Sequence, residues 1–392
     1  ADSFHANYCL SMAFLEKLAH LAGPQHHSAM HRRLQSDPNV QEFLGRWNLP
    51  IYFQLRFGEI SSRLDKALEL TEREGLCPEA GAGGGGSTAL PQEASAGEVG
   101  GGEKKFDLPV LQEAWGCLQY IWGDGVFLAP LTHRFMCLTL QVLQRLSVWV
   151  QQERWKRGSG DIVLVAFDCD RLCHLVRHHL QGRIAQQVSG STGKAVQGLG
   201  GEEEGKGGEA AALACELVEG GLAPCTEAIR QLWQDLVKDI AQQCAHMLQA
   251  VRGITATYRM TNKPAPTKPS PFVPNILKPL RDFSQEWGDR VPEQAAGWKH
   301  QVLNIVTERY VEVVLELLGT VKQMEDSLKK RRGASRQSKG GLSDADKILL
   351  QLLFNIREFG HELETFGLKL EDNDSYQKLL EQVLPAEKFM PK

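Results

Sequence analysis

Long apolar runs are missing from this sequence of 392 residues. A helix that crosses a bilayer needs roughly 18 to 20 predominantly apolar residues, whereas the longest run here, Ile162 to Phe167, is closed by acidic residues on both sides. We therefore expect that this chain does not cross a membrane. The formal net charge is −4 at pH 7, so the chain also lacks the excess of positive charge that attracts nucleic acid. A nucleic-acid-binding function is not expected.

A regular cysteine framework is missing as well. The nine cysteines are an odd number, they are scattered along the chain, and several lie in apolar stretches with helical periodicity. A secreted disulfide scaffold is expected to show an even set in a compact pattern, so we predict reduced, cytosolic thiols. The chain opens on Ala1 with neither the basic nor the apolar segment of a secretory signal. We expect it to be part of a longer protein.

Amphipathic helical periodicity is what the sequence does contain, together with 42% hydrophobic residues. In the clearest example, Leu49 to Leu70, Pro50 suits the first helical turn, because its missing N–H would have no intrahelical partner there. Apolar residues at spacings of three and four predict one buried stripe: Phe53, Phe57, Ile60, Leu64, Ala67 and Leu68. Charged residues, including Arg56 and Glu59, are predicted to fill the opposite face. Similar patterns along the chain predict an all-α fold.

Shifts in composition divide this helical sequence into segments. Two Gly-rich stretches contain too few large apolar residues to offset the entropy cost of ordering the chain. They predict flexible inserts at 81–105 and 189–209. Prolines remove backbone donors and disfavour helix in the preceding residue, so they predict a linker and domain boundary at 263–275. The predicted helical segments are 1–80, 106–188, 210–262 and 276–392. The first two are assigned to the first bundle, and the last is a carboxyl-terminal helical domain with a basic loop at 329–341.

Three of the expected helices carry predictions for single residues. In the helix Ser3 to Leu21, three apolar residues recur at a spacing of four: Leu10, Phe14 and Leu18. Asp161 and Ser343 are predicted N-caps of later helices, because a side-chain oxygen at this position accepts from an otherwise unpaired N–H. The helix after Ser343 is predicted to bury Ile348, Leu352, Ile356, Phe359, Leu363 and Phe366.

Two groups of metal-ligating residue types occur, and we predict no metal site at either. His27 and His31 are four residues apart, but we expect no third ligand of a suitable type near them, so a solvated loop is predicted. The second group contains i, i+4 pairs within one expected helix: Cys169, Cys173, His174 and His178. One helix rarely closes a tetrahedral zinc site by itself, and no CxxC motif is present. We predict core thiols beside exposed imidazoles.

Two short stretches resemble functional signatures without meeting their requirements. The stretch SGSTGKA has the end of a phosphate-binding loop, but Val188 stands where the first glycine of that motif belongs. Ala195 replaces the Ser or Thr that would hold Mg²⁺. The basic run from Lys329 to Lys339 suits a nuclear-import patch, or Ser335 a phosphorylation site, but a solvated loop is the favoured interpretation. No catalytic residue and no cofactor site is predicted.

Motifs in two parts of the chain resemble one known family. Leu49 to Phe57, followed by Glu59 and Ile60, resembles the LPxYFQ(I/L)RFxEI run of the subunit 2 family of the conserved oligomeric Golgi complex, which is a vesicle-tethering family of the helical-rod type. Val321 to Lys329 and Ser343 to Ile348 resemble the carboxyl-terminal domain of the same family. The matches occur in the family's order, so the chain is similar to the carboxyl-terminal portion of that family.

The resemblance implies elongated tandem helical bundles of the tethering helical-rod type. It implies a non-enzymatic subunit that scaffolds a Golgi tether in intra-Golgi retrograde transport and Golgi organisation. The implied location is peripheral, on the cytoplasmic face of the Golgi membrane. The implied partners are the other subunits of the complex, mainly those of the first lobe, and indirectly SNAREs, Rabs and golgins.

Two alternative functions stay open at the level of the sequence. An all-α hydrolase or transferase could assemble a site from distant residues such as His133, Asp168 and His361. A helical scaffold or adaptor outside the Golgi is the other alternative, and the basic residues from Lys329 to Arg332 are its only hint.

Overall fold

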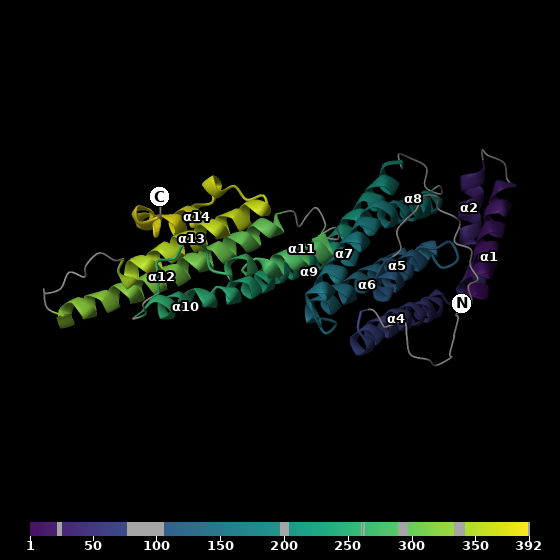
Figure 1. The fold of residues 1–392 in the computed structure, drawn as a ribbon. Coiled ribbons are helices and arrows are strands. Elements are labelled where there is room, and N and C mark those ends of the chain that lie inside the picture. Colours follow the sequence, from purple (N-terminus) through teal and green to yellow (C-terminus); the bar gives the residue numbers. More distant parts are fainter. Residues whose placement is uncertain are drawn as a thin grey trace. The chain divides into compact units, whose positions relative to one another are not determined.

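The computed structural model describes residues 1–21, 26–76, 106–196, 204–259, 261, 263–288, 297–332 and 342–390. Within these ranges the chain consists of helices and their connections and contains no β-strand, so the predicted all-α fold is confirmed (Figure 1). None of these helices combines the length and the apolar character that a membrane crossing requires. The predicted insert at 81–105 and the candidate phosphorylation site Ser335 lie outside the described residues.

The chain divides into two compact units, Ala1–Gln231 and Leu232–Lys392. The helices before the division are α1 (Asp2–His20), α2 (His27–Ser36), α3 (Pro38–Gly45), α4 (Leu49–Glu74), α5 (Pro109–Ile121), η1 (Ala129–Leu131), α6 (Thr132–Gln152), α7 (Ser159–Leu175), η2 (Val176–Leu180) and α8 (Gln181–Val196). The division falls within α9 (Glu204–Met247). The helices after it are α10 (Gln249–Tyr258), η3 (Val273–Asn275), α11 (Lys278–Trp287), α12 (Trp298–Arg332), α13 (Asp344–Thr365), η6 (Leu370–Asp372), α14 (Asp374–Glu381) and η7 (Leu384–Phe389).

The proline-rich segment 263–275 does not coincide with this division, contrary to the predicted boundary. It packs along α13 instead. Gln351 of α13 donates to the backbone oxygen of Lys268 at 3.0 Å, and Asn355 Oδ1 accepts from the backbone N–H of Ser270 at 2.7 Å. The prolines exclude regular helix, but backbone groups of Lys263, Lys268 and Ser270 find partners on α13, and the segment lies in the second unit.

Two predicted loop segments are partly helical. Within 189–209, α8 continues to Val196 and α9 begins at Glu204. The two helices contact each other there, because Ser189 donates to the backbone oxygen of Gly207 at 3.3 Å. Likewise α12 continues through the basic residues to Arg332, and the rest of the predicted loop, 333–341, lies outside the described residues. Tertiary packing outweighs the weak helix propensity of the local sequence at the α8–α9 contact.

Helix starts follow the capping rules, with one correction. Ser343 Oγ accepts from the N–H of Asp346 at 3.1 Å, so its predicted N-cap is confirmed. Asp161 is not an N-cap, because α7 begins at Ser159. Its carboxylate reaches back to the N–H groups of Arg157 at 2.7 Å and Gly158 at 3.1 Å, in the role of the acidic third residue of a capping box.

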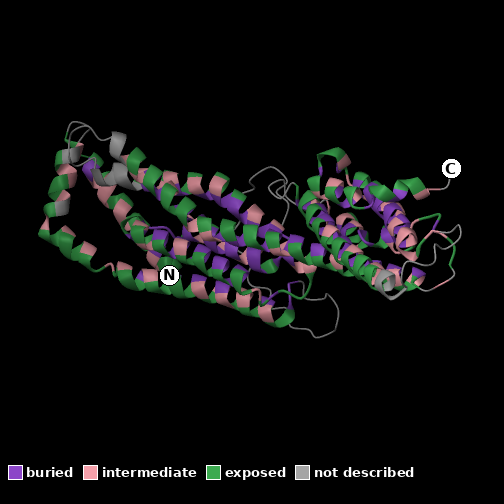
Figure 2. Ribbon diagram, turned by 90° about the vertical axis from the view of Figure 1, so that its left-hand side faces the viewer, coloured by how far each residue is buried: buried purple, intermediate pink, exposed green. Residues whose placement is uncertain are grey.

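Buried residues lie on the faces by which the helices contact one another (Figure 2). The predicted stripe of α13 is confirmed for five of its members, which are all buried: Ile348, Leu352, Ile356, Phe359 and Leu363. In α4 the stripe is displaced, because Phe57 is 39% exposed while Tyr52 and Arg56 are buried beside Ile60. In α1, the expected stripe residues Leu10 and Phe14 are exposed.

The displaced stripe of α4 predicts which substitutions unfold the first unit. Ile60→Asp puts a charge at a position with 0% exposure and is expected to cost about 4 kcal/mol or more. Phe57→Asp changes a partly exposed side chain and is expected to cost about 1 kcal/mol or less. Leu352 is 0% exposed on α13, so Leu352→Asp is expected to destabilise the second unit as Ile60→Asp destabilises the first. Thermal unfolding followed by circular dichroism checks the ranking, and equal losses for Ile60→Asp and Phe57→Asp would contradict it.

Candidate functional site

A buried guanidinium lies at the centre of the motif that resembles the Golgi family. Arg56 is 2% exposed and shares one face of α4 with Tyr52, Ile60 and Leu64, each four residues from the next. A buried charge is tolerated only when hydrogen bonds and opposite charges replace its water. The neighbouring elements must therefore supply these partners.

Partners reach Arg56 from three other parts of the first unit. Its Nη1 donates to Tyr120 Oη of α5 at 2.6 Å, and its Nη2 donates to the backbone oxygen of Gly125 at 3.3 Å. Nη2 also donates to Asp2 of α1 at 2.5 Å. Within α4, Arg56 donates to Tyr52 Oη at 3.2 Å and to Glu59 at 3.1 Å. The guanidinium thus joins α1, α4, α5 and the connection after α5.

The electrostatics of this cluster fit a structural role. Burial alone lowers the pKa of Arg56, but hydrogen bonds to Tyr52 and Asp2 outweigh it, so the pKa is raised and the group stays charged. The same hydrogen bond lowers the pKa of Asp2. Burial raises the pKa of Tyr120 to about 12, which keeps its hydroxyl protonated as a donor to Glu59 at 3.0 Å.

An open apolar groove lies between α6 and the first part of α9. Its volume is about 720 Å³, and its apolar lining is Leu140, Leu213, Leu217, Gly220, Gly221 and Pro224. Leu213 and Leu217 are 56% and 44% exposed. Gly221 leaves room for the side chain of Leu140, because a Cβ there would lie 2.6 Å from Leu140 Cδ2. A groove of this kind suits an apolar side-chain ridge of another helix.

The buried thiols lie where the sequence predicts them. Cys169 and Cys173 of α7 are buried, and the adjacent His174 and His178 are exposed, so core thiols beside exposed imidazoles are confirmed. Cys225 of α9 joins the two thiols: its hydrogen bond with Cys173, together with burial, raises the pKa of Cys173, and its hydrogen bond with Cys169 raises its own pKa. The raised pKa values keep Cys173 and Cys225 protonated, and the buried thiols act as packing groups.

The residues of the alternative enzyme site are engaged separately. Asp168 is fully buried, and its Oδ2 accepts from the N–H of Leu108 at 2.7 Å. His133 lies on the exposed side of α6. His361 is exposed on α13 and lies 3.3 Å from Glu364 of its own helix. The stretch SGSTGKA lies within α8. These placements give the buried carboxylate the role of a cap for the start of α5.

Another residue that can bind metal lies close to His27 and His31, which the sequence analysis did not predict. His27 and His31 lie on α2 and not in a loop. Glu16 of α1 lies 3.3 Å from His27 and 3.7 Å from His31, so the premise that no third ligand is near is wrong. The signal in the sequence is a second i, i+4 pair, Glu16 and His20, on the preceding helix.

Removal of Arg56 is expected to cost more than removal of the exposed arginine two turns further along α4. Arg56→Ala empties a position that is 2% exposed and removes the hydrogen bonds that join α4 to Asp2, Tyr120 and Gly125, so it should cost about 3 kcal/mol. Arg63→Ala removes a half-exposed ion pair with Glu113 and should cost about 1 kcal/mol or less. Urea unfolding of the two variants measures the difference, and equal costs would argue against a central role for Arg56.

Asp168 predicts a pH dependence of stability. Burial raises its pKa to about 6, well above about 3.9 in an unfolded chain. The folded state then holds a proton that the unfolded state loses, so this contribution is complete below about pH 4 and is lost as the pH rises through about 6. The loss is about 3 kcal/mol. Asp168→Asn removes this dependence, so unfolding by urea between pH 4 and 7 should diverge from wild type. Parallel profiles would contradict the assignment.

Comparison with known proteins identifies the family. A family model described as "COG complex component, COG2, C-terminal" matches residues 45–356. Three curated relatives are each named "Conserved oligomeric Golgi complex subunit 2". The Homo sapiens protein is 28% identical over 428 residues, covering 98% of this chain and 53% of the relative. The Arabidopsis thaliana protein is 27% identical, covering 98% of this chain and 50% of the relative. The Drosophila melanogaster protein is 25% identical, covering 98% and 52%.

These matches support the resemblance found in the sequence motifs. The chain spans about half the length of the curated relatives it matches. No solved structure matches it. The family model covers most of both units, including the groove between α6 and α9 and Arg56 with its partners Tyr52, Glu59, Tyr120 and Gly125, while Asp2 lies before the matched range. The chain therefore belongs to the subunit 2 family of the conserved oligomeric Golgi complex.

Proposed function

We propose that this chain is a non-enzymatic helical scaffold within a multisubunit Golgi vesicle-tethering complex. The family match across residues 45–356 is the observation that carries the proposal. In this role the chain binds the other subunits of the complex, mainly those of the first lobe. It contributes to intra-Golgi retrograde transport and Golgi organisation from the cytoplasmic face of the Golgi membrane, where it is peripheral. SNAREs, Rabs and golgins are contacted through the assembled complex.

The groove between α6 and α9 supports a docking role. Leu213 and Leu217 of its apolar lining are exposed, and Gln141, Gln144 and Glu216 add polar side chains to the lining. Protein–protein contacts usually combine apolar and polar side chains in this way. We assign this groove to an amphipathic helix of a neighbouring subunit, because an amphipathic helix binds by laying its apolar face into an apolar groove.

The placement of the alternative catalytic residues gives no support to an enzyme. His133 and His361 are exposed, while Asp168 is buried and holds the backbone of Leu108. A general base must lie within hydrogen-bond reach of the proton it removes, so a buried carboxylate committed to a backbone N–H is poorly placed for catalysis.

Affinity capture of the tagged chain from cells tests the proposal. The other subunits of the complex are expected to co-purify with the wild-type chain. The double variant Leu213→Asp with Leu217→Asp should lower their recovery tenfold or more, because charged side chains in the groove repel an apolar ridge. Both positions are about half exposed, so the fold should persist, which circular dichroism checks.

Leu315→Asp is the matched control, because Leu315 is 47% exposed on α12 and lies outside the groove. It should leave recovery unchanged. Failure of the wild-type chain to capture any other subunit would overturn the proposed function. Equal recovery with the groove variant and with Leu315→Asp would overturn the assignment of the groove alone.

A further inference from the structure

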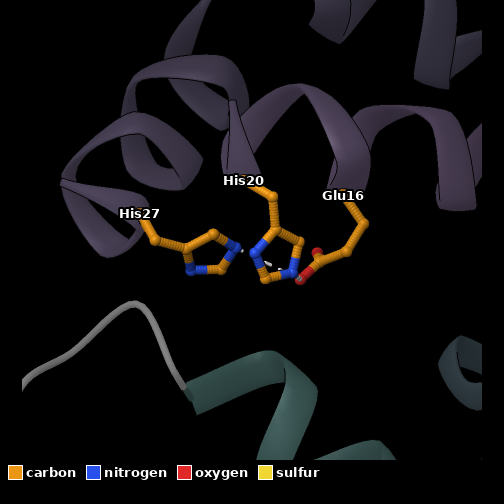
Figure 3. Close-up of side chains that lie close together, drawn as sticks. All are labelled: Glu16, His20 and His27. Carbon is orange, nitrogen blue, oxygen red and sulfur yellow. Dashed lines mark ion pairs between the residues drawn. The ribbon is translucent and has the colours of Figure 1, made fainter. Parts of the chain in front are cut away.

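Two pairs of ligand-type residues face each other where α1 contacts α2. Glu16 and His20 lie one turn apart on α1, and His27 and His31 lie one turn apart on α2. Figure 3 shows Glu16, His20 and His27 extending from the two helices toward the same space. Two neighbouring helices with two ligands each can surround an ion, which one helix rarely does alone.

The distances between these side chains match the dimensions of a zinc site. Glu16 Oε1 lies 3.5 Å from Nε2 of His20 and 3.3 Å from Nε2 of His27. One ligand atom from each of the three residues lies within 4.8 Å of the other two. Zinc bonds of about 2.0–2.1 Å in a tetrahedron place neighbouring ligand atoms about 3.3 Å apart. Small side-chain rotations are therefore enough to put the three atoms around one ion.

His31 is placed to complete the coordination. Its Nε2 lies 3.7 Å from the second carboxylate oxygen of Glu16, and its ring centre lies 6.3 Å from that of His27. Rotation of the side chain is needed to bring His31 into the set formed by the other three. Three imidazoles and one carboxylate are ligand types that zinc takes in four-coordinate sites.

An unsatisfied buried nitrogen points to the same place. Nε2 of His27 is buried and has no hydrogen bond within the described residues, because its 3.3 Å approach to Glu16 is close but not aligned as a hydrogen bond. Buried polar atoms are normally satisfied, so this atom calls for a partner. The rings of His20 and His27 lie 4.2 Å apart, so the two imidazoles occupy the same space between the helices.

We propose that Glu16, His20 and His27, completed by His31, bind one Zn²⁺ ion that joins α1 to α2. Four protein ligands leave no open position, so the ion has a structural role. It holds together two helices that each bury few residues of their own: α1 buries His5, Tyr8 and Ala19. The inference is independent of the proposed tethering function.

Titration of the metal-free chain with ZnCl₂ by calorimetry tests the site, and CoCl₂ with visible absorption reports the coordination. One equivalent of Zn²⁺ should bind and raise the melting temperature. Glu16→Gln and His27→Ala should each weaken binding tenfold or more, and His31→Ala by a smaller factor. Glu16→Gln keeps the size of the side chain, so it decides the result where His27→Ala fails to fold.

Two histidine variants serve as controls. His26→Ala removes an exposed neighbour of His27, and His178→Ala removes one member of the other close pair, whose rings lie 4.2 Å apart on α7 and η2. Both should bind Zn²⁺ like the wild type. The proposal would be overturned if Zn²⁺ showed no saturable binding. It would also be overturned if Glu16→Gln bound Zn²⁺ like the wild type, or if His178→Ala lost binding while Glu16→Gln kept it.

Discussion

The need to satisfy one buried positive charge organises the first unit. Arg56 is buried on α4, and its guanidinium contacts Asp2 of α1, Tyr120 of α5 and the backbone of Gly125. Each contact fixes the position of a different element relative to α4. The hydroxyl of Tyr52 extends the network by donating to the backbone oxygen of Val126 at 2.7 Å. A polar network of this kind specifies one arrangement of helices more sharply than apolar contacts do, because a misplaced helix leaves a buried charge without a partner.

Helix positions were predictable from the sequence, but the buried face of each helix was less so. Periodicity and capping locate α4 and α13, because both signals are local. The burial of Arg56 depends on partners that lie far away in sequence, so its charge led to a wrong prediction of exposure. Phe57 fits the apolar spacing as well as Ile60 does, and only the positions of α5 and α6 decide that Ile60 is buried. The local pattern of apolar residues therefore predicts the buried stripe of a helix to within about one residue per turn.

Some features of the candidate sites likewise follow from local sequence, and others depend on how distant segments pack. The buried thiols Cys169 and Cys173 follow from their place on an apolar helix face. The approach of Glu16 and His20 to His27 depends on how α1 and α2 pack, which no spacing within either helix reveals. The groove between α6 and α9 likewise depends on a contact between distant segments, in which the side chain of Leu140 lies against Gly221.

The first helix is held near both of its ends, and this affects what its middle can do. Asp2 binds Arg56 at one end, and Glu16 and His20 meet the histidines of α2 at the other. Leu10 and Phe14 lie between these anchors and are 68% and 61% exposed. Exposed apolar residues on a freely moving helix would have to be ordered when a neighbour covers them, at a cost in conformational entropy. Because the anchors already restrict α1, that cost is smaller, and surfaces of this kind suit the proposed scaffold role.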